Sequence, residues 1–164
     1  MLNIEASYAA LYALILTANL PFEPVNTNGR VMQQWETFGS VNQPAVYLQQ
    51  GLMKVEQNTP NGALGLNRWT LNAKAWFFFR RNTITDDNSP PDTLIPATVY
   101  NQIVQAINSV ITPAPGQKQT LAAQNNGTPL VTNVRITEAA WDEGTLDQNA
   151  GQVVVMVGLE MLAA

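Results

Sequence analysis

The sequence predicts an α+β fold in which two main helices pack on one face of an open mixed or antiparallel sheet of about five strands. One observation is the residue-by-residue alternation of apolar and polar side chains in Trp69–Phe79 and Gln152–Leu162, which is typical of strands with a buried face. Another is a pair of segments with helical apolar spacing, near the N-terminus and after Pro96. At 164 residues, the chain is long enough for one core, so we expect a single domain over 1–164.

The first helix is predicted to begin after Asn3, which can cap it, and to run to about Ala18. Glu5 lies in the first turn, where the helix dipole favours an acid, and Pro21 and Pro24 follow the end. Apolar residues recur at helical spacing: Ile4, Tyr8, Leu11, Tyr12 and Ile15.

Two strands are expected before the long aromatic segment. The first is Arg30–Phe38, with Val31, Trp35 and Phe38 as core candidates. The second runs through Ala45–Leu48 and Leu52–Val55, with a bulge or bend at Gly51 between them. A turn over Asn58–Gly65, which contains Pro60-Asn61-Gly62, would then lead into the next strand.

The segment Trp69–Arg81 is predicted to be the central strand. Its odd-numbered residues through Phe79 are apolar, whereas Thr70, Asn72 and Lys74 point to the other side. Trp76 and Phe78 break this alternation, so the second half is apolar on both faces. Either a helix or a partner subunit should cover that end of the strand.

A polar, proline-rich loop is predicted over Asn82–Asp92. The second helix should begin near Pro96 and end at Thr112–Gly116, with an amide-rich loop over Gln117–Pro129 behind it. Its apolar face contains Val99, Ile103, Ala106, Ile107, Val110 and Ile111.

The last third of the chain predicts two further strands. Leu130–Thr137 alternates as a strand with one apolar face, formed by Leu130, Thr132, Val134 and Ile136. An acidic loop over Trp141–Gly151 should follow. The run Gln152–Leu162 is apolar on one face and carries Val154 and Met156 on the other, which predicts an interior strand.

Composition favours a component of an assembly. Charged residues make up only 12% of the chain, so its surface must be built largely from neutral polar groups, which lose less on desolvation at subunit contacts. A net charge of −4 argues against sequence-independent nucleic-acid binding. The N-terminus lacks the basic region of a signal peptide, and the apolar run Ala9–Leu16 is too short to span a bilayer, so we expect no membrane association and a cytoplasmic location at synthesis.

Catalysis is not expected. The chain has no His and no Cys, which removes the usual general base, the nucleophilic dyads and most transition-metal sites. Acidic groups occur at Asp86, Asp87 and Asp92 and at Asp142, Glu143 and Asp147, but they do not have EF-hand spacing and are better explained as solvated loops. We therefore predict no catalytic, cofactor or metal site.

The candidate functional residues are those of an interaction surface. Tryptophans often anchor interfaces, although burial in the core is the commoner role for each of them. Arginines at a strand end and acids in exposed loops can reach a partner. The candidates are Trp76, Phe78, Arg80, Arg81, Asp86, Asp87, Trp141, Asp142 and Glu143.

The order of motifs along the chain resembles the tail terminator, or tail completion, proteins of tailed bacteriophages. The matching features, in order, are Ala9–Tyr12, Arg30 ahead of Trp35, Pro44-Ala45, Trp69–Phe79, the helix from Val99 to Pro113, Thr120-Leu121, Asn133–Ile136, Asp142–Gly144 and Gln152–Val155. Together they cover nearly the whole chain, although no single motif is a chemical signature. The family tends to have two glycines where this chain has Ala122-Ala123, so the turn there can differ.

The resemblance implies a small structural subunit of the virion. Members form a ring, usually hexameric, that caps the finished tail tube, stops its polymerisation and offers a docking face to the head connector or head-closure protein. The expected location is the tail-neck region of the virion, after assembly in the host cytoplasm, with genomic DNA passing through the lumen. The alternatives are another virion component, such as a tail tube or head-closure protein, and, less favoured, a carboxylate-dependent hydrolase.

Overall fold

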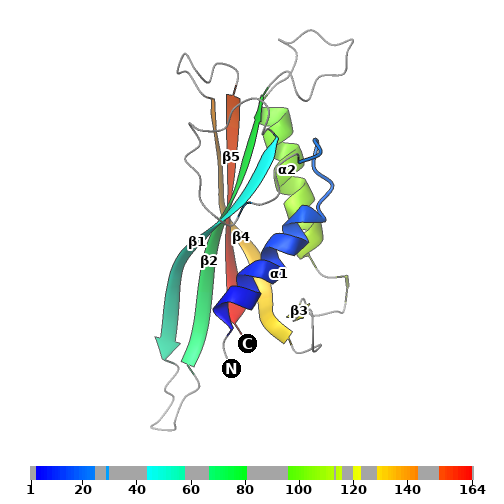
Figure 1. Cartoon of the computed structure of the whole chain (residues 1–164). Helices are drawn as coiled ribbons and strands as arrows, with labels where there is room; N and C mark the ends of the chain where they lie inside the picture. Colours follow the sequence, from blue (N-terminus) through cyan, green and yellow to red (C-terminus); the bar gives the residue numbers. More distant parts are fainter. Residues whose placement is uncertain are drawn as a thin grey trace.

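The protein has the predicted α+β architecture, with one layer of helices on one face of a five-stranded sheet (Figure 1). The computed structural model describes residues 3–24, 29, 44–57, 67–80, 96–112, 114–115, 120–122, 129–143 and 152–163, with the backbone alone at several strand ends. The helices are α1 (Ile4–Leu16) and α2 (Pro96–Ile111). The strands are β1 (Ala45–Gln57), β2 (Asn67–Arg80), β3 (Thr120–Ala122), β4 (Pro129–Glu143) and β5 (Gln152–Ala163).

The strands lie in the order β1-β2-β5-β4-β3, and each neighbouring pair is antiparallel. The segment expected to be the central strand, β2, is an interior strand between β1 and β5, but β5 occupies the middle of the sheet. The prediction of an interior C-terminal strand is confirmed, because β5 pairs with β2 on one side and with β4 on the other.

Both helices cover the same face of the sheet, as expected, and the core lies between them and the sheet (Figure 1). Directly opposed residues of β2 and β5, such as Phe77 and Val155, project into this core, and both are fully buried. The odd-numbered alternation in both strands therefore marks the helix-covered face. The largest fully buried side chains are Phe77, Phe79, Leu11, Ile15, Leu71, Ile103, Ile107, Leu159, Met161 and Val46.

The first helix begins as predicted and ends slightly earlier. The Asn3 side chain accepts a hydrogen bond from the Ala6 amide at 3.0 Å, which satisfies one of the free amides of the first turn. Thr17 forms the C-cap, so α1 ends at Leu16, two residues before Ala18. Ile4 was expected on the buried face but is 36% exposed, because it lies in the first turn at the end of the helix.

The second helix agrees with its prediction. Val99, Ile103, Ala106, Ile107 and Ile111 are buried against the core, and the side chains between them are exposed or half-buried. The helix ends at Ile111, and the Thr112 hydroxyl then donates to the Asn108 carbonyl at 2.6 Å. A proline disfavours helical geometry at the residue before it, which here is Thr112, so the helix ends at Ile111.

The bulge expected around Gly51 is present. The register of β1 on β2 slips between Gln50 and Met53, where the β1 strand contains one extra residue. A β-carbon on Gly51 would lie 2.9 Å from the Asn72 carbonyl oxygen, so the close approach of the two strands requires glycine there.

Strand β4 differs from its prediction in length and in pattern. It includes Trp141, Asp142 and Glu143, which were expected in a loop, because β5 provides ladder partners for all three. Two bulges, after Thr132 and after Ile136, change the phase of alternation, so Thr132 does not share a face with Val134. The first contains Asn133 at φ 56°, a conformation that asparagine tolerates better than most residues.

A short edge strand was missed. Thr120–Ala122 lies in the segment predicted as a loop, yet it pairs with the start of β4 as β3. Three residues are too few for a periodic signal. The predicted strand Arg30–Phe38, the turn Asn58–Gly65 and the loop Asn82–Asp92 lie outside the described residues.

Candidate interaction surface on the helix-free face

Apolar side chains gather on one half of the sheet face that the helices leave uncovered. The register places Tyr47, Trp76 and Met156 in one row across β1, β2 and β5, and Phe78 and Val154 in the next. Ala140 of β4 extends the first row beyond Met156. We call this set of residues the apolar patch.

Aromatic contacts organise the patch. Trp76 stacks on Phe78 with ring centroids 6.5 Å apart and an interplanar angle of 20°, and Phe78 meets Tyr47 edge to face at 5.9 Å. The Trp76 indole donates a hydrogen bond to the Gln49 side-chain oxygen at 2.9 Å. Trp76 thus satisfies its polar atom inside the subunit, which leaves the ring as apolar contact area.

Exposure increases across the patch from β1 to β4. Tyr47 and Phe78 are each 6% exposed, whereas Trp76, Val154 and Met156 are half-buried and Ala140 is exposed. Phe78 is therefore largely buried within a single subunit and offers little surface to a neighbour. The accessible part of the patch lies over β2, β5 and β4.

The other half of the same face is polar. Lys74 of β2 and Glu138 of β4 form a 3.9 Å ion pair across Gly158 of β5. A β-carbon on Gly158 would lie 2.5 Å from the Glu138 side chain, so the missing side chain makes room for this pair. Farther along, the Arg135 Nε donates to Glu160 at 2.8 Å. Lys74, Glu138 and Arg135 are exposed and Glu160 is half-buried, so the two pairs mark a partly solvated region beside the patch.

The candidate residues of the sequence are divided between the two faces. Trp141 lies opposite the core residue Val155, on the helix-covered side, and packs on Tyr100 of α2 with ring centroids 4.7 Å apart. It is nevertheless 46% exposed. Trp141 and Trp76 thus mark opposite faces of the same end of the sheet.

The structure shows the backbone position of three of the six charged candidates. The backbone of Arg80 pairs with Gln152, and Asp142 and Glu143 pair with Val154 and Val153, which brings both segments to the end of the sheet near Phe78. Arg81, Asp86 and Asp87 lie outside the described residues.

Sequence reasoning missed Tyr47, Val154, Met156 and Ala140 as members of the patch. The sequence shows that Val154 and Met156 depart from the alternation of their strand, in the same way as Trp76 and Phe78. That shared departure is the signal that could have paired them. The register that joins them arises only when β2 and β5, separated by more than 70 residues, meet in the sheet.

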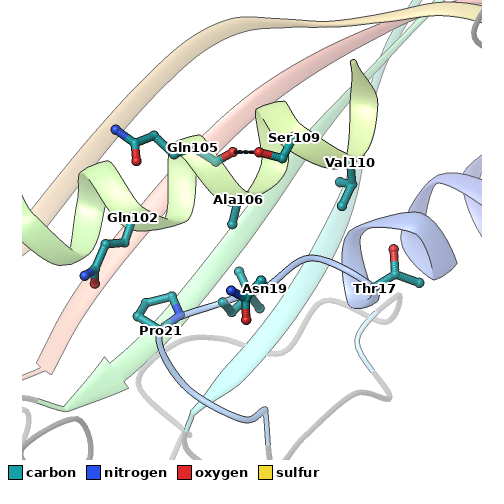
Figure 2. A pocket seen from close by; sticks show the side chains of 9 residues that line it. Thr17, Asn19, Pro21, Gln102, Gln105, Ala106, Ser109 and Val110 are labelled. Carbon is teal, nitrogen blue, oxygen red and sulfur yellow. Dashed lines mark hydrogen bonds between the residues drawn. The ribbon is translucent and has the colours of Figure 1, made fainter. Parts of the chain in front are cut away.

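A separate groove of about 500 Å³ lies between α2 and the chain that follows α1 (Figure 2). Gln102, Ala106 and Val110 line it from α2, and Asn19 and Pro21 line it from the other side. No ionisable side chain is among its lining residues, which also include Thr17, Leu20, Gln105 and Ser109. The groove thus presents amide, hydroxyl and apolar groups, none of which is a general base at neutral pH.

Two tyrosines with shifted pKa values have structural roles. Burial raises the pKa of Tyr8 and Tyr12 above 10.0, opposed by a backbone hydrogen bond from Gly51 or Gly29 respectively, so both phenols stay protonated at neutral pH. Within the described residues, no three acidic side chains approach closely enough to hold a metal ion. In the same part of the chain, neither helix has the length and apolar character needed to cross a membrane.

Comparison of the sequence with family models and with curated proteins gives no match.

Proposed function

We propose that this protein is a tail terminator subunit of a tailed bacteriophage, which caps the tail tube as a ring, halts tube polymerisation and presents a docking face to the head connector. The observation that carries the proposal is the ordered resemblance from Ala9 to Val155. The α+β fold, with helices on one face of an open antiparallel sheet, is compatible with it.

Two features of the surface support a role in assembly. The accessible part of the apolar patch, at Trp76, Met156 and Ala140, lies next to the exposed Lys74–Glu138 ion pair, which is the pattern of an apolar contact with a polar rim. The low charged fraction of 12% reduces the desolvation cost of packing subunits side by side.

The proposed ring is a hexamer whose neighbours make heterologous contacts, as closed cyclic rings require. Each neutral polar contact is worth only about 1 kcal/mol, so the free subunit can remain monomeric when dilute and close into a ring on a tube end. The proposed partners are other copies of this chain, the tail tube protein and the head connector. The proposal assigns no catalysis and no cofactor.

The test is to add purified protein to polymerising tail tubes and to measure tube length by electron microscopy. A terminator shortens the tubes in proportion to its concentration and adds cap density at one end, whereas a tail tube subunit extends them. The same protein after thermal unfolding is the control. Unchanged lengths without cap density at either end would exclude the terminator function.

A further inference from the structure

The second half of β1 is exposed on every residue from Gln50 to Val55. It includes Leu52, Met53 and Val55, which are 76%, 42% and 44% exposed. In Figure 1 this part of β1 extends along the outer side of the sheet, past the start of α1. The first half differs, because the Val46 carbonyl accepts from Tyr12 and the Leu48 amide donates to the Gly29 carbonyl.

These two bonds show which backbone groups of β1 point away from β2. Val46 and Leu48 stand opposite Phe77 and Ala75, so residues opposite odd-numbered positions of β2 turn their amide and carbonyl outward. Beyond the bulge, Met53 and Val55 stand opposite Leu71 and Trp69 and therefore do the same. In the described part of the chain, no strand lies beyond β1 to receive these groups.

We propose that a second copy of this chain pairs with this edge, antiparallel and two-fold symmetric about Val55. Val55 would then exchange both of its outward hydrogen bonds with Val55 of the second copy, and Met53 would pair with the Gln57 position of the second copy. About six ladder hydrogen bonds result, and the two sheets become one continuous sheet. The contact also covers Met53 and Val55, whose exposure is otherwise unexplained.

Charge selects this register. Centring on Val55 places Lys54 opposite Glu56 of the second copy, and the symmetry repeats the pair. Positions 54 and 56 are the non-hydrogen-bonded ones, where opposed residues come closest and opposite charges stabilise pairing. Centring on Met53 would instead place Lys54 opposite Leu52 and Glu56 opposite Gln50, without complementary charge.

A bulge and a lysine often protect an edge strand from pairing with another chain, and β1 has both, at Gly51 and Lys54. Protection does not explain the exposed apolar residues on both sides of Lys54, Met53 and Val55. The pairing concerns the free protein and does not rest on the proposed capping function. An experiment can therefore contradict one proposal without contradicting the other.

The first experiment measures mass against concentration by sedimentation, for the unchanged protein and for charge variants. We expect a reversible dimer that Lys54→Glu weakens about tenfold or more, because two attractive pairs become repulsive. The double variant Lys54→Glu, Glu56→Lys should restore dimerisation. A monomer at all concentrations up to about 1 mM, or failure of the double variant to recover, would overturn the proposal.

The second experiment uses the outward direction of the Val55 amide. Val55→Pro removes that donor without removing a bond to β2, so it should abolish the dimer while thermal unfolding of the subunit changes little. Val55→Thr keeps the amide and the branched shape and should still dimerise. Amide exchange at Met53 and Val55 should slow as the concentration rises, and concentration-independent exchange would contradict the pairing.

Discussion

The hydroxyl of Tyr12 donates a hydrogen bond to the backbone carbonyl of Val46 at 2.9 Å, in a buried position. The same hydroxyl accepts from the Gly29 amide at 3.2 Å. One helical turn earlier, the Tyr8 hydroxyl donates to the Asn72 carbonyl at 2.8 Å. Two tyrosines thus attach α1 to the backbone of β1 and β2, and the apolar contacts of the helix are held at a defined position on the sheet.

Tyr12→Phe should destabilise the subunit by about 1 to 3 kcal/mol, because it leaves the buried Val46 carbonyl and Gly29 amide without their shared partner. Tyr100→Phe is the matched control, since Tyr100 is half-buried and contributes its ring to Trp141. Urea unfolding of both variants measures the difference. Equal stabilities would show that water replaces the hydroxyl at no cost.

Stability should fall at alkaline pH through the same tyrosines. Burial raises the pKa of Tyr8 and Tyr12 above the ordinary 10.0, so the folded state holds their protons more tightly than the unfolded chain. Their contribution is complete below the unfolded pKa and is lost as pH rises through the folded pKa. Unfolding free energies should stay level below about pH 10 and decline above it, and less so in the Tyr8→Phe, Tyr12→Phe double variant. An identical slope in both proteins would contradict this assignment.

Gly29→Ala should be more harmful than Gly158→Ala. A β-carbon at Gly29 would collide with the Val46 backbone oxygen and approach the Tyr47 ring, and neither can move without displacing the strand. At Gly158 the obstacle is the flexible Glu138 side chain, which can rotate away. We expect a loss of about 1 to 3 kcal/mol for the first and a smaller loss for the second, measured by thermal unfolding. The reverse order would mean that the chain around Gly29 adapts more easily than the ion pair.

Phe77→Ala should cost about 3 to 5 kcal/mol, because Phe77 is fully buried beneath the helices. Phe78→Ala, on the opposite face, should also destabilise the single subunit, since Phe78 is only 6% exposed. Chemical unfolding of the two variants compares the faces directly. If Phe78→Ala left subunit stability unchanged and impaired only assembly, the interior role of Phe78 would be wrong.

Ala140→Lys should weaken tube capping without unfolding the subunit. Ala140 is the exposed end of the apolar patch, next to Met156, so a charge there would have to be desolvated in any contact. Asn101→Lys adds the same charge at an exposed position of α2 and serves as control. Tube lengths measured by electron microscopy should separate the two variants. Equal capping by both would show that the patch does not contact the tube or a neighbouring subunit.

The amino-acid pattern alone predicts both helices, the N-cap at Asn3, the bulge near Gly51 and the buried faces of β2 and β5. These features are local, because periodicity and capping depend only on residues that are close together in the sequence. It also indicated that Trp76 and Phe78 require cover on a second face. It did not indicate β3, whose three residues carry no period, or the extension of β4 through Trp141 to Glu143.

Other features depend on residues that are distant in the sequence, so they appear only in the folded structure. The middle place of β5, the row that joins Tyr47, Trp76 and Met156, and the burial of Phe78 all follow from strand order and register. The two bulges in β4 show the reason most directly, since one extra residue moves every later side chain to the other face. Whether an apolar side chain faces core, neighbour or solvent is therefore a property of the assembled sheet and not of the strand alone.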